Sequence, residues 1–442
     1  MARSSRAREE IRRFLDIGAV QVAELDLDGD EAVLRPGPGS PPVTHGEVFV
    51  LVRRGGRPVG TLLGRVPEGA DARVVLAERA RAECAPAPLP SARADAGAPE
   101  DAGPAGEPPY TSVVVATRER AGQLARALDS LLAQDHPQFE IVVVDNAPVT
   151  DETRELVERK YAERVRYVCE RVPGLAIAHN TGLAAVRGEV VAFTDDDVVA
   201  DPRWLTELTA PFAADAGLGC GTGLILPARL TTPAQVLLES HGGFAKGFTP
   251  RTYDPARPPG DEPLFPFTAG RFGSGANMAF RTAVLRSVGG FDPATGAGTA
   301  ARGGDDLYGF VRVLAQGHRL RYTPSALVWH HHRETWQDLE IQAYGYGAGL
   351  TAYLTAVLVN RPALLPAFLA RLPRGLAHAR TLTAVRETEG GGAPGDHDVR
   401  THPWPRRLSR LQRRGMLYGP VGYVRARRAL RATAGATVRG AR

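Results

Sequence analysis

The alternation of short apolar runs with helical patterns, between Ser112 and Phe193, constrains the fold of this 442-residue chain more than any other feature. Strand-like β-branched runs are separated by segments whose apolar residues recur every three or four positions. Strands joined by helices pair in parallel and are covered on both faces, so the pattern predicts an α/β fold with ligands at the carboxyl ends of the strands. The predicted strands are 112–116, 141–144, 165–168 and 190–193, and the predicted helices are 123–132, 150–161 and 181–186.

An acidic cluster follows the last of these strands. The apolar run Val190–Phe193 leads into three consecutive aspartates, Asp195 to Asp197. Adjacent carboxylates repel one another, so a fold keeps them together when a cation or strong solvation offsets the repulsion. Mg²⁺ or Mn²⁺ bridging a diphosphate suits such a cluster, because these ions retain waters and accept phosphate oxygens as ligands. The alternative is an acidic turn that caps a helix starting near Pro202.

Two further strands end in polar residues at the same predicted edge. Thr117 and Arg118 follow the first strand, where their side chains can reach a base and a phosphate, and Asp145 and Asn146 follow the second. A carboxylate at that position can accept the imide N–H of uracil or a ribose hydroxyl. Since Asp also favours turns and helix N-termini, a purely structural role for Asp145 stays open.

Composition changes divide the rest of the chain. Residues 1–83 hold short β-like runs between Gly and Pro clusters and predict a small β-rich module. Residues 84–108 are rich in Ala, Pro and Gly and predict a linker. An α/β domain at 109–340 and a helical, Arg-rich extension at 341–442 complete the predicted organisation. The β-like runs of the module are 32–34, 48–52 and 59–63.

Charge and cysteine content narrow the class of protein. The net charge is +5 and the pI is about 9.3, but the basic residues are nearly all Arg in an Ala-, Gly- and Pro-rich chain, so genome composition explains much of this charge. Cys84, Cys169 and Cys220 are too few and too scattered for a disulfide framework or a thiolate zinc site. With no apolar leader, and with Tyr344–Val359 too short to span a bilayer, we expect a cytoplasmic protein.

The C-terminal segment is strongly basic. No acidic residue follows Arg400, whereas eleven arginines lie between Arg406 and Arg442. Three interpretations stay open: contact with an anionic membrane surface at its inner face, a solvated helix face, or contact with an anionic acceptor. Stacking aromatics are not interleaved with these arginines, so specific nucleic-acid binding is not expected.

Several sequence blocks follow one another in a fixed order between about Tyr110 and Arg333. They are Val113-Val-Val-Ala-Thr-Arg, Ile141-Val-Val-Val-Asp-Asn, Pro173-Gly-Leu-Ala-Ile-Ala-His-Asn-Thr-Gly, Val191-Ala-Phe-Thr-Asp-Asp-Asp, Gly289-Gly-Phe-Asp and Gly304-Asp-Asp. In their order and spacing, these blocks resemble the family 2 glycosyltransferases with the GT-A fold. The resemblance covers roughly half of the chain.

The resemblance implies an enzyme with a mostly parallel GT-A sheet that transfers a sugar from a nucleotide-sugar donor, as a hexosyltransferase does, with Mn²⁺ or Mg²⁺ as cofactor. Asp197 would ligate the metal directly. Asp195 and Asp196 would address the ribose or a metal-bound water, and Asp195 is also a candidate metal ligand. The residues implied on the donor side are Thr117, Arg118, Asp145, Asn180, Asp195 and Asp196.

The pair Asp305-Asp306 falls where the resemblance implies Glu-Asp. Asp306 would be the general base of a single inverting displacement, in which the acceptor oxygen attacks opposite the diphosphate. Because the first member is Asp and not the longer Glu, the question of which carboxylate reaches the acceptor hydroxyl stays open. The structural alternative is an acidic helix cap after Gly304.

A run of three histidines follows the predicted strand 326–329. His330 is favoured over its two neighbours as a further metal ligand, and the alternative is an ordinary packed histidine. The Gly-rich stretch 273–278 allows either close approach of a substrate to the backbone or a simple turn.

Other functions are compatible with parts of this sequence. Leu218-Gly-Cys-Gly-Thr-Gly lies between a predicted helix and an apolar run, so it fits a strand better than the cofactor loop of a methyltransferase. A non-catalytic nucleotide-sugar or carbohydrate binding protein of the same fold is the main alternative, and donor hydrolysis is another. UDP is the favoured nucleotide because Asp145 suits uracil, with GDP and dTDP open. The acceptor classes considered are envelope polysaccharide, glycolipid and secondary metabolite.

Overall fold

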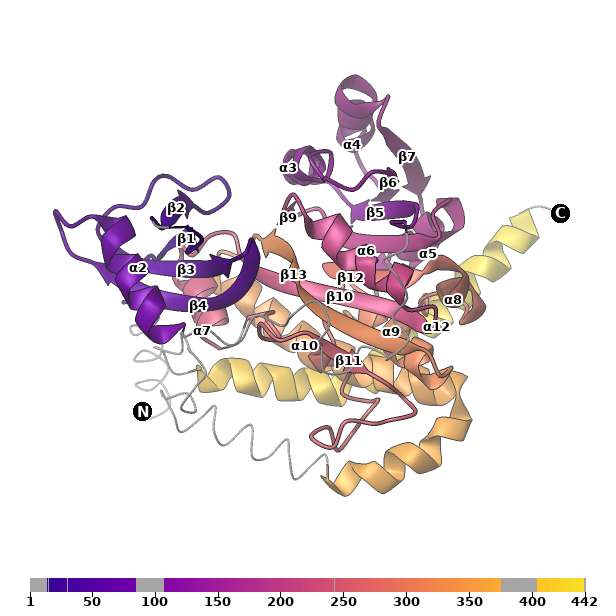
Figure 1. Cartoon of the computed structure of the whole chain (residues 1–442). Helices are drawn as coiled ribbons and strands as arrows, with labels where there is room; N and C mark the ends of the chain where they lie inside the picture. The colour runs from indigo at the N-terminus through magenta and orange to yellow at the C-terminus, as the bar shows by residue number, and fades with distance from the viewer. Residues whose placement is uncertain are drawn as a thin grey trace, which may run out of the picture.

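The computed structural model describes residues 14, 16–29, 31–84, 107–241, 243–374 and 404–440. Its centre is one large sheet flanked by helices (Figure 1). The strands of this sheet are β5 (Thr111–Thr117), β6 (Phe139–Asn146), β7 (Val165–Glu170), β8 (Val190–Asp195), β9 (Val198–Ala200), β10 (Leu218–Pro227), β11 (Arg251–Tyr253), β12 (Asn277–Arg281) and β13 (Arg319–His330).

The nine strands form a mixed sheet in the order β11-β13-β10-β12-β8-β5-β6-β7, with β9 paired to β13. β5 pairs in parallel with β6 and β8, and β6 pairs in parallel with β7. β12 runs antiparallel to both of its neighbours. The four predicted strands and the α/β class are therefore confirmed, and the antiparallel β12 makes the sheet mixed rather than uniformly parallel.

Helices cover both faces of the sheet. The predicted helix at 181–186 begins earlier, at Leu175, and the predicted helix at 150–161 is a short α-helix continued by a π-helical turn, η1. The elements are α3 (Ala121–Leu131), α4 (Glu152–Leu156), η1 (Val157–Tyr161), α5 (Leu175–Ala185), α6 (Trp204–Ala214), α7 (Pro233–Ser240), η2 (Ala269–Arg271), α8 (Thr282–Ser287), α9 (Asp305–Ala315), α10 (Trp336–Asn360) and η3 (Pro362–Leu364).

The central strands are buried on both faces, which explains their continuous apolar sequences. Successive side chains of a strand point to opposite faces. On β5, Val113 and Val115 pack against residues of α3 and α6. Val114 and Ala116 pack on the other face, in the cluster that includes residues of α5, α9 and α10. This double burial holds the carboxyl ends of β5, β6 and β8 in fixed positions.

The N-terminal module is a second sheet, seen at the left of Figure 1. It has the order β2-β1-β3-β4 and packs against one helix, α2. The three predicted β-like runs lie in β2, β3 and β4; β1 and α2 were not predicted, because polar and charged residues interrupt their apolar pattern. The elements are β1 (Gln21–Asp26), β2 (Val33–Pro36), β3 (Gly46–Arg54), β4 (Arg57–Val66) and α2 (Ala72–Glu83).

This module shares a hydrophobic core with the large sheet. Phe49 and Leu51 of β3 belong to the same buried cluster as Leu226 of β10 and Trp329 of β13. The opposite face of β3, including Val50, packs with α2 in a separate cluster. The module is therefore attached through apolar residues on one face of its sheet. Most of the predicted linker, residues 85–106, lies outside the described residues.

A buried arginine joins the two sheets. Arg53 Nε donates to Glu24 within the module at 2.7 Å, and Arg53 Nη2 donates to Asp201, which follows β9, at 2.6 Å. Both ion pairs are largely shielded from solvent. Removing one member of such a pair leaves a buried charge without its partner, so these contacts fix the orientation of the module.

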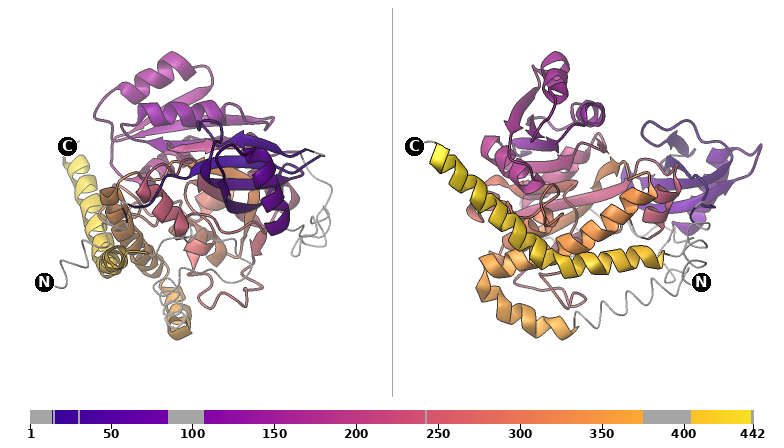
Figure 2. Two further views of the ribbon diagram at one scale, coloured as in Figure 1. Left: turned by 90° about the vertical axis from the view of Figure 1, so that its left-hand side faces the viewer. Right: turned by 180° about the vertical axis from the view of Figure 1, so that it is seen from behind.

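The predicted C-terminal helical extension contains the long helix α12 (Arg406–Gly440), which packs against α10 (Figure 2). The segment Tyr344–Val359, predicted to be a packed or peripheral helix, is the part of α10 that makes this contact. Among the described residues, no helix taken singly has the length and apolarity of a bilayer span. The helices Trp336–Asn360 and Pro362–Arg374 meet those limits only when counted together, with a 110° bend between them.

Glycines allow the two helices to approach closely. A Cβ atom at Gly415 would lie 2.1 Å from the carbonyl oxygen of Tyr344, and one at Gly419 would lie 2.3 Å from the carbonyl oxygen of Ala348. Neither distance is sterically tolerable, so these positions require a residue without a side chain. Helix α12 therefore packs directly against α10, and α10 in turn packs against α9.

We expect Gly415→Ala to lower the free energy of unfolding by about 1–3 kcal/mol, because the methyl group forces α12 away from α10. Gly122→Ala in α3 is the matched control, since nothing lies within 4 Å of the added Cβ atom. Chemical denaturation of both variants tests this. Equal stability of the two variants would contradict the proposed close packing.

Candidate active site

The carboxyl ends of the parallel strands bring the predicted polar residues together. Strand register places Thr117 of β5 opposite Asp145 of β6, and Ala116 of β5 opposite Asp195 of β8. On the other side of β8, the short strand β9 pairs with the end of β13 and sets His330 opposite Val198. Residues that are far apart in sequence therefore meet at one edge of the sheet.

Asp195, Asp197 and His330 offer ligand atoms that all lie within 4.8 Å of one another. His330 Nε2 lies 3.3 Å from Asp197 Oδ1, a buried oxygen that accepts no hydrogen bond. The N–H of His331 donates to the Asp197 carbonyl at 2.9 Å and holds the acidic loop against β13. Two carboxylates and one imidazole form a donor set that fits a divalent cation, and the buried Asp197 oxygen that accepts no hydrogen bond is consistent with this.

The surroundings shift the pKa values of the three aspartates of the acidic cluster in different directions. Burial and the neighbouring Asp197 carboxylate raise the pKa of Asp195 to about 7. Burial also opposes ionisation of Asp197, but His330 and Arg120 outweigh it and lower the pKa of Asp197 to about 2. For Asp196, burial and Asp197 outweigh Arg120 and raise the pKa. A bound cation would favour the ionised form of all three carboxylates.

Asp196 is held by the end of the first strand. It accepts hydrogen bonds from Thr117 Oγ1 at 2.7 Å and from Arg120 Nη1 at 3.0 Å. Arg120 Nη1 also lies 3.6 Å from Asp197 Oδ2. Thr117 was a predicted donor-site residue, and the structure brings it into the acidic cluster.

Arg120, which was not predicted as a site residue, contacts this cluster, and the predicted role of Arg118 in the nucleotide pocket stays a prediction. Arg118 is exposed, and the structure does not bring it to the aspartates. Glu119 between them has a positive φ of 53°, which turns the chain so that Arg120 faces the cluster. Arg118 lies one residue and Arg120 three residues beyond the end of β5, and the turn at Glu119 decides which of them faces the aspartates.

Asp145 is completely buried, and only one of its two carboxylate oxygens accepts a hydrogen bond. Tyr167 donates its hydroxyl to Asp145 Oδ2 at 2.9 Å, whereas Oδ1 is buried without a partner. Burial, partly offset by Tyr167, raises the pKa of Asp145. Tyr167 was missed because its place beside Asp145 depends on the pairing of β6 with β7, in which Cys169 lies opposite Asp145.

The acidic pair begins helix α9. Gly304 precedes the helix with a φ of 88°, and a Cβ atom there would lie 2.5 Å from the carbonyl oxygen of Gly349 in α10. Only glycine satisfies both conditions. Asp305 and Asp306 lie in the first turn, where the helix dipole favours negative charge. The residues of the predicted catalytic pair are thus also the acidic start of a helix.

The two carboxylates of the pair have different surroundings. Asp305 is only 4% exposed, and its Oδ2 lies 3.1 Å from His179 Nδ1. Asp306 is half-buried; it accepts the N–H of Gly275 at 2.9 Å and its neighbour Leu307 N–H at 2.8 Å. Burial and the Asp305 charge raise the pKa of Asp306 to about 6. Asp306 is therefore the more accessible member, and the Gly-rich stretch forms a turn that holds it.

His179 connects the acidic pair to the acidic cluster. Besides its contact with Asp305, it acts electrostatically on both Asp195 and Asp306. Sequence reasoning missed His179, although it lies in the His-Asn-Thr-Gly block. The next residue, Asn180, exchanges two hydrogen bonds with the backbone of Phe291, at 2.8 and 2.9 Å. Its amide therefore fixes that turn, and its predicted role on the donor side stays a prediction.

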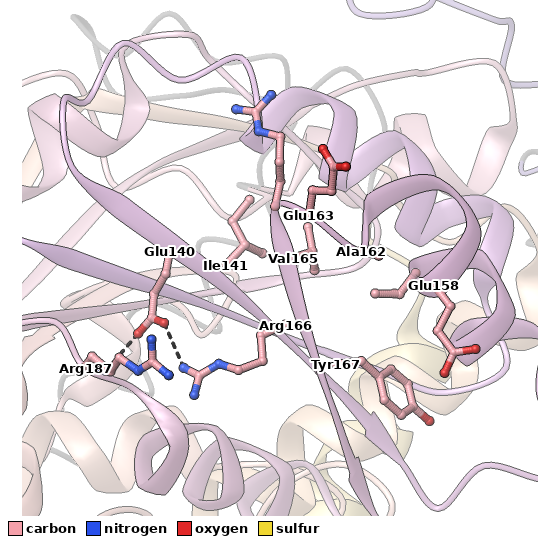
Figure 3. A pocket seen from close by; sticks show the side chains of 11 residues that line it. Glu140, Ile141, Glu158, Ala162, Glu163, Val165, Arg166, Tyr167 and Arg187 are labelled. Carbon is pink, nitrogen blue, oxygen red and sulfur yellow. Dashed lines mark hydrogen bonds and ion pairs between the residues drawn. The ribbon is translucent and has the colours of Figure 1, made fainter.

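A shallow hollow of ≈ 450 Å³ lies elsewhere, where β6 and β7 begin (Figure 3). Glu140 accepts from Arg166 at 2.8 Å and from the Arg187 backbone N–H at 2.8 Å within it. Because parallel strands begin and end at opposite edges, this hollow is separate from the strand ends that carry the aspartates.

Comparison with known proteins adds an independent finding. Residues 112–286 match the model of glycosyl transferase family 2. An uncharacterised glycosyltransferase of Nostoc is 34% identical over 111 residues, which are 24% of this chain and 34% of the relative. The pre-mycofactocin glycosyltransferase of Mycobacterium tuberculosis is 27% identical over 236 residues, 53% of this chain and 46% of the relative. The chain thus spans less than half the length of either relative.

Among solved structures, a Pyrobaculum calidifontis mannosyltransferase in complex with GDP-Man and Mn²⁺ is similar at a TM-score of 0.44 and 20% identity, covering 72% of this chain and 89% of that one. The match to the family model includes the strand ends that carry Thr117, Asp145 and the aspartates. The family suggested by the sequence motifs is confirmed: this chain carries a glycosyl transferase family 2 domain at residues 112–286.

Proposed function

We propose that the protein is a metal-dependent inverting glycosyltransferase that moves a sugar from a nucleotide-sugar donor to an acceptor hydroxyl. One observation carries the proposal: the fold brings His179 close enough to act electrostatically both on Asp195, in the metal-type group Asp195, Asp197 and His330, and on the accessible carboxylate Asp306. Inverting transfer needs charge stabilisation for the leaving diphosphate and a base for the acceptor, on opposite sides of the sugar.

Asp145 supports a nucleotide site. Its buried Oδ1 accepts no hydrogen bond, and a buried oxygen of this kind costs free energy. A ligand N–H or hydroxyl that donated to it would remove this cost. The imide N–H of uracil fits this requirement, and UDP is therefore the proposed nucleotide. Tyr167 orients the carboxylate by donating to its other oxygen.

Asp195, Asp197 and His330 would hold the divalent ion. When bound, such an ion neutralises charge on the diphosphate leaving group. Asp196 would remain outside this set, because Thr117 and Arg120 occupy its two oxygens. The imidazole ligand favours Mn²⁺ over Mg²⁺, which prefers an all-oxygen shell.

Asp306 is the proposed base. The N–H groups of Gly275 and Leu307 hold its carboxylate in place, and a pKa of about 6 leaves it ionised, yet still basic, near neutral pH. Asp305 is buried against His179 and acts as a positioning residue for that ring. In this proposal, Asp306 and not Asp305 reaches the acceptor hydroxyl.

The remaining parts of the chain would support this site. In this proposal, residues 109–340 form the catalytic domain, and the module 1–83 and the extension 341–442 support it through their shared cores. The acceptor belongs to envelope polysaccharide, glycolipid or secondary-metabolite synthesis. A non-catalytic nucleotide-sugar binding protein is the alternative, and the raised pKa of an accessible Asp306 favours catalysis over it.

Helix α12 supports contact with an anionic membrane surface. Leu417, Val421 and Val424 are 82%, 49% and 43% exposed and follow one another at helical spacing, which forms an apolar strip on the outer face. Exposed arginines, such as Arg414 and Arg428, flank this strip. Apolar side chains at lipid depth with arginines beside them are typical of interfacial helices.

Donor binding is the first test of the function. We expect calorimetry to detect Mn²⁺-dependent binding of UDP, more weakly of GDP and dTDP, and to detect none with Asp197→Ala. Asp306→Asn should retain donor binding but lower the rate of transfer at pH 7.5 by about 10²–10⁴-fold, since it removes only the base.

Two outcomes would contradict this assignment. If wild-type protein binds none of the three nucleotides with Mn²⁺, the donor proposal fails. If Asp306→Asn transfers sugar normally whereas Asp305→Asn does not, the roles of the pair are reversed. Product analysis distinguishes transfer from hydrolysis of the donor.

The free energy of unfolding, measured in EDTA to remove divalent cations, should depend on the ionisation of Asp195. The folded pKa of Asp195 lies above its unfolded value, so stability from its protonated form is present at low pH and is lost as pH rises through about 7. Asp195→Asn, which mimics the protonated form, should stabilise the protein by about 1–3 kcal/mol at pH 8 and by clearly less at pH 5, since the loss begins near the unfolded pKa of 3.8. The exposed Glu68→Gln is the control, and a destabilised Asp195→Asn at pH 8 would contradict the prediction.

Vesicle co-sedimentation tests the α12 surface. We expect binding to vesicles that contain phosphatidylglycerol and none to phosphatidylcholine alone. Val421→Glu should weaken this binding by about tenfold, because it places a like charge in the apolar strip facing anionic lipid. Val74→Glu, at a similarly exposed valine of α2, should leave binding unchanged. Equal effects of the two substitutions would contradict a lipid-binding role for α12.

A further inference from the structure

A chain of buried polar side chains extends behind the metal-type group. His330 Nδ1 lies 3.0 Å from His332 Nδ1, and His332 Nε2 lies 3.1 Å from Glu239 Oε2. All three side chains are shielded, with exposures of 9% for His330, 3% for His332 and 8% for Glu239. Neither His332 nor Glu239 is required for the proposed transfer as described above.

These contacts determine which ring nitrogens carry hydrogen. A carboxylate only accepts hydrogen bonds, so His332 Nε2 must donate to Glu239. A neutral His332 ring then has its lone pair on Nδ1, which must accept from His330 Nδ1–H. His330 therefore keeps its hydrogen on Nδ1, and its Nε2 faces the Asp197 carboxylate at 3.3 Å, to which it donates when no cation is bound. With Nδ1 engaged by His332, Nε2 is the ring atom of His330 that can give up its hydrogen and ligate a metal beside Asp197.

The surrounding structure holds this chain rigidly. Glu239 lies near the end of α7, whose start is fixed by a capping box of Thr232 and Gln235. Gln235 Nε2 also donates to the carbonyl of His332 at 3.2 Å, so the same helix holds both the backbone and the ring of that residue. The ring of Phe244 covers the two histidines, with centroids 5.1 Å from His330 and 5.5 Å from His332.

The N-terminal module packs against the same helix. Val236 and Leu237 of α7 share a buried cluster with Phe49 and Leu51 of the module. The module therefore has a physical connection to the metal-type group, through α7 and Glu239.

We propose that Glu239 and His332 are positioning residues that fix the tautomer and orientation of His330, so that its Nε2 is available to a divalent cation. The inference rests on the proposed metal dependence of the enzyme. Partners that hydrogen-bond to a metal-ligating histidine raise its basicity and fix its ring, and their loss weakens metal affinity by about 10–100-fold. A purely structural pair of buried histidines would have no such effect on metal binding.

Manganese binding to the full chain tests the proposal. We expect Glu239→Gln, which preserves side-chain size, to weaken Mn²⁺ binding by about 10–100-fold as measured from the electron paramagnetic resonance of free Mn²⁺. Glu262→Gln is the matched control, because Glu262 is a buried carboxylate, 4% exposed, that pairs with Arg271 outside this cluster. Unchanged Mn²⁺ affinity in Glu239→Gln, with a normal effect of Asp197→Ala, would overturn the inference.

A spectroscopic measurement avoids reliance on a variant that fails to fold. In metal-free wild-type protein labelled with nitrogen-15 histidine, we expect His330 to carry hydrogen on Nδ1, and Glu239→Gln to show a fraction of His330 without hydrogen on Nδ1. A wild-type His330 that lacks hydrogen on Nδ1 would overturn the inference. If wild-type protein binds no Mn²⁺ but His330 carries hydrogen on Nδ1 as expected, the metal-dependent function fails while the hydrogen-bond assignment stands.

Discussion

Repulsion among the carboxylates at the end of β8 is the constraint on which the rest of the site depends. Each aspartate is held by a different part of the structure. Thr117 and Arg120, at the end of β5 and the start of α3, hold Asp196, whereas His330 at the end of β13 faces Asp197. The negative charge of Asp195 is the least well compensated by neighbouring groups, and its pKa rises to about 7. The fold keeps a local charge imbalance that a divalent cation would relieve.

The elements around the large sheet stabilise the positions of these groups. β13 and α7 pack against the N-terminal module, which is joined to the main sheet by the ion pairs of Arg53. On the other side, α9 begins at Gly304 in contact with α10, and α10 packs closely against α12. Among the described residues of the two terminal regions, none contributes to the acidic cluster. Each instead packs against an element that carries a residue of the proposed mechanism.

Several site residues could be predicted because each follows a strand directly. Asp195 ends β8, Asp197 lies two residues beyond it, and His330 ends β13, so strand ends alone indicated a common edge. Tyr167 could not be predicted in the same way, because it lies inside β7, and its contact with Asp145 depends on strand pairing. Arg120 was missed because a single positive φ at Glu119 decides which arginine faces the aspartates.

The sequence by itself determined the α/β class, the order of the central strands and helices, and the aspartates at the end of β8, since these depend on local apolar patterns and on residues adjacent to strands. Tertiary structure decided the antiparallel insertion of β12, the burial of Asp305 beside His179, and the chain from His330 through His332 to Glu239. These features join segments separated by many residues. A local pattern carries no information on such contacts, because they form only when distant segments pack against one another.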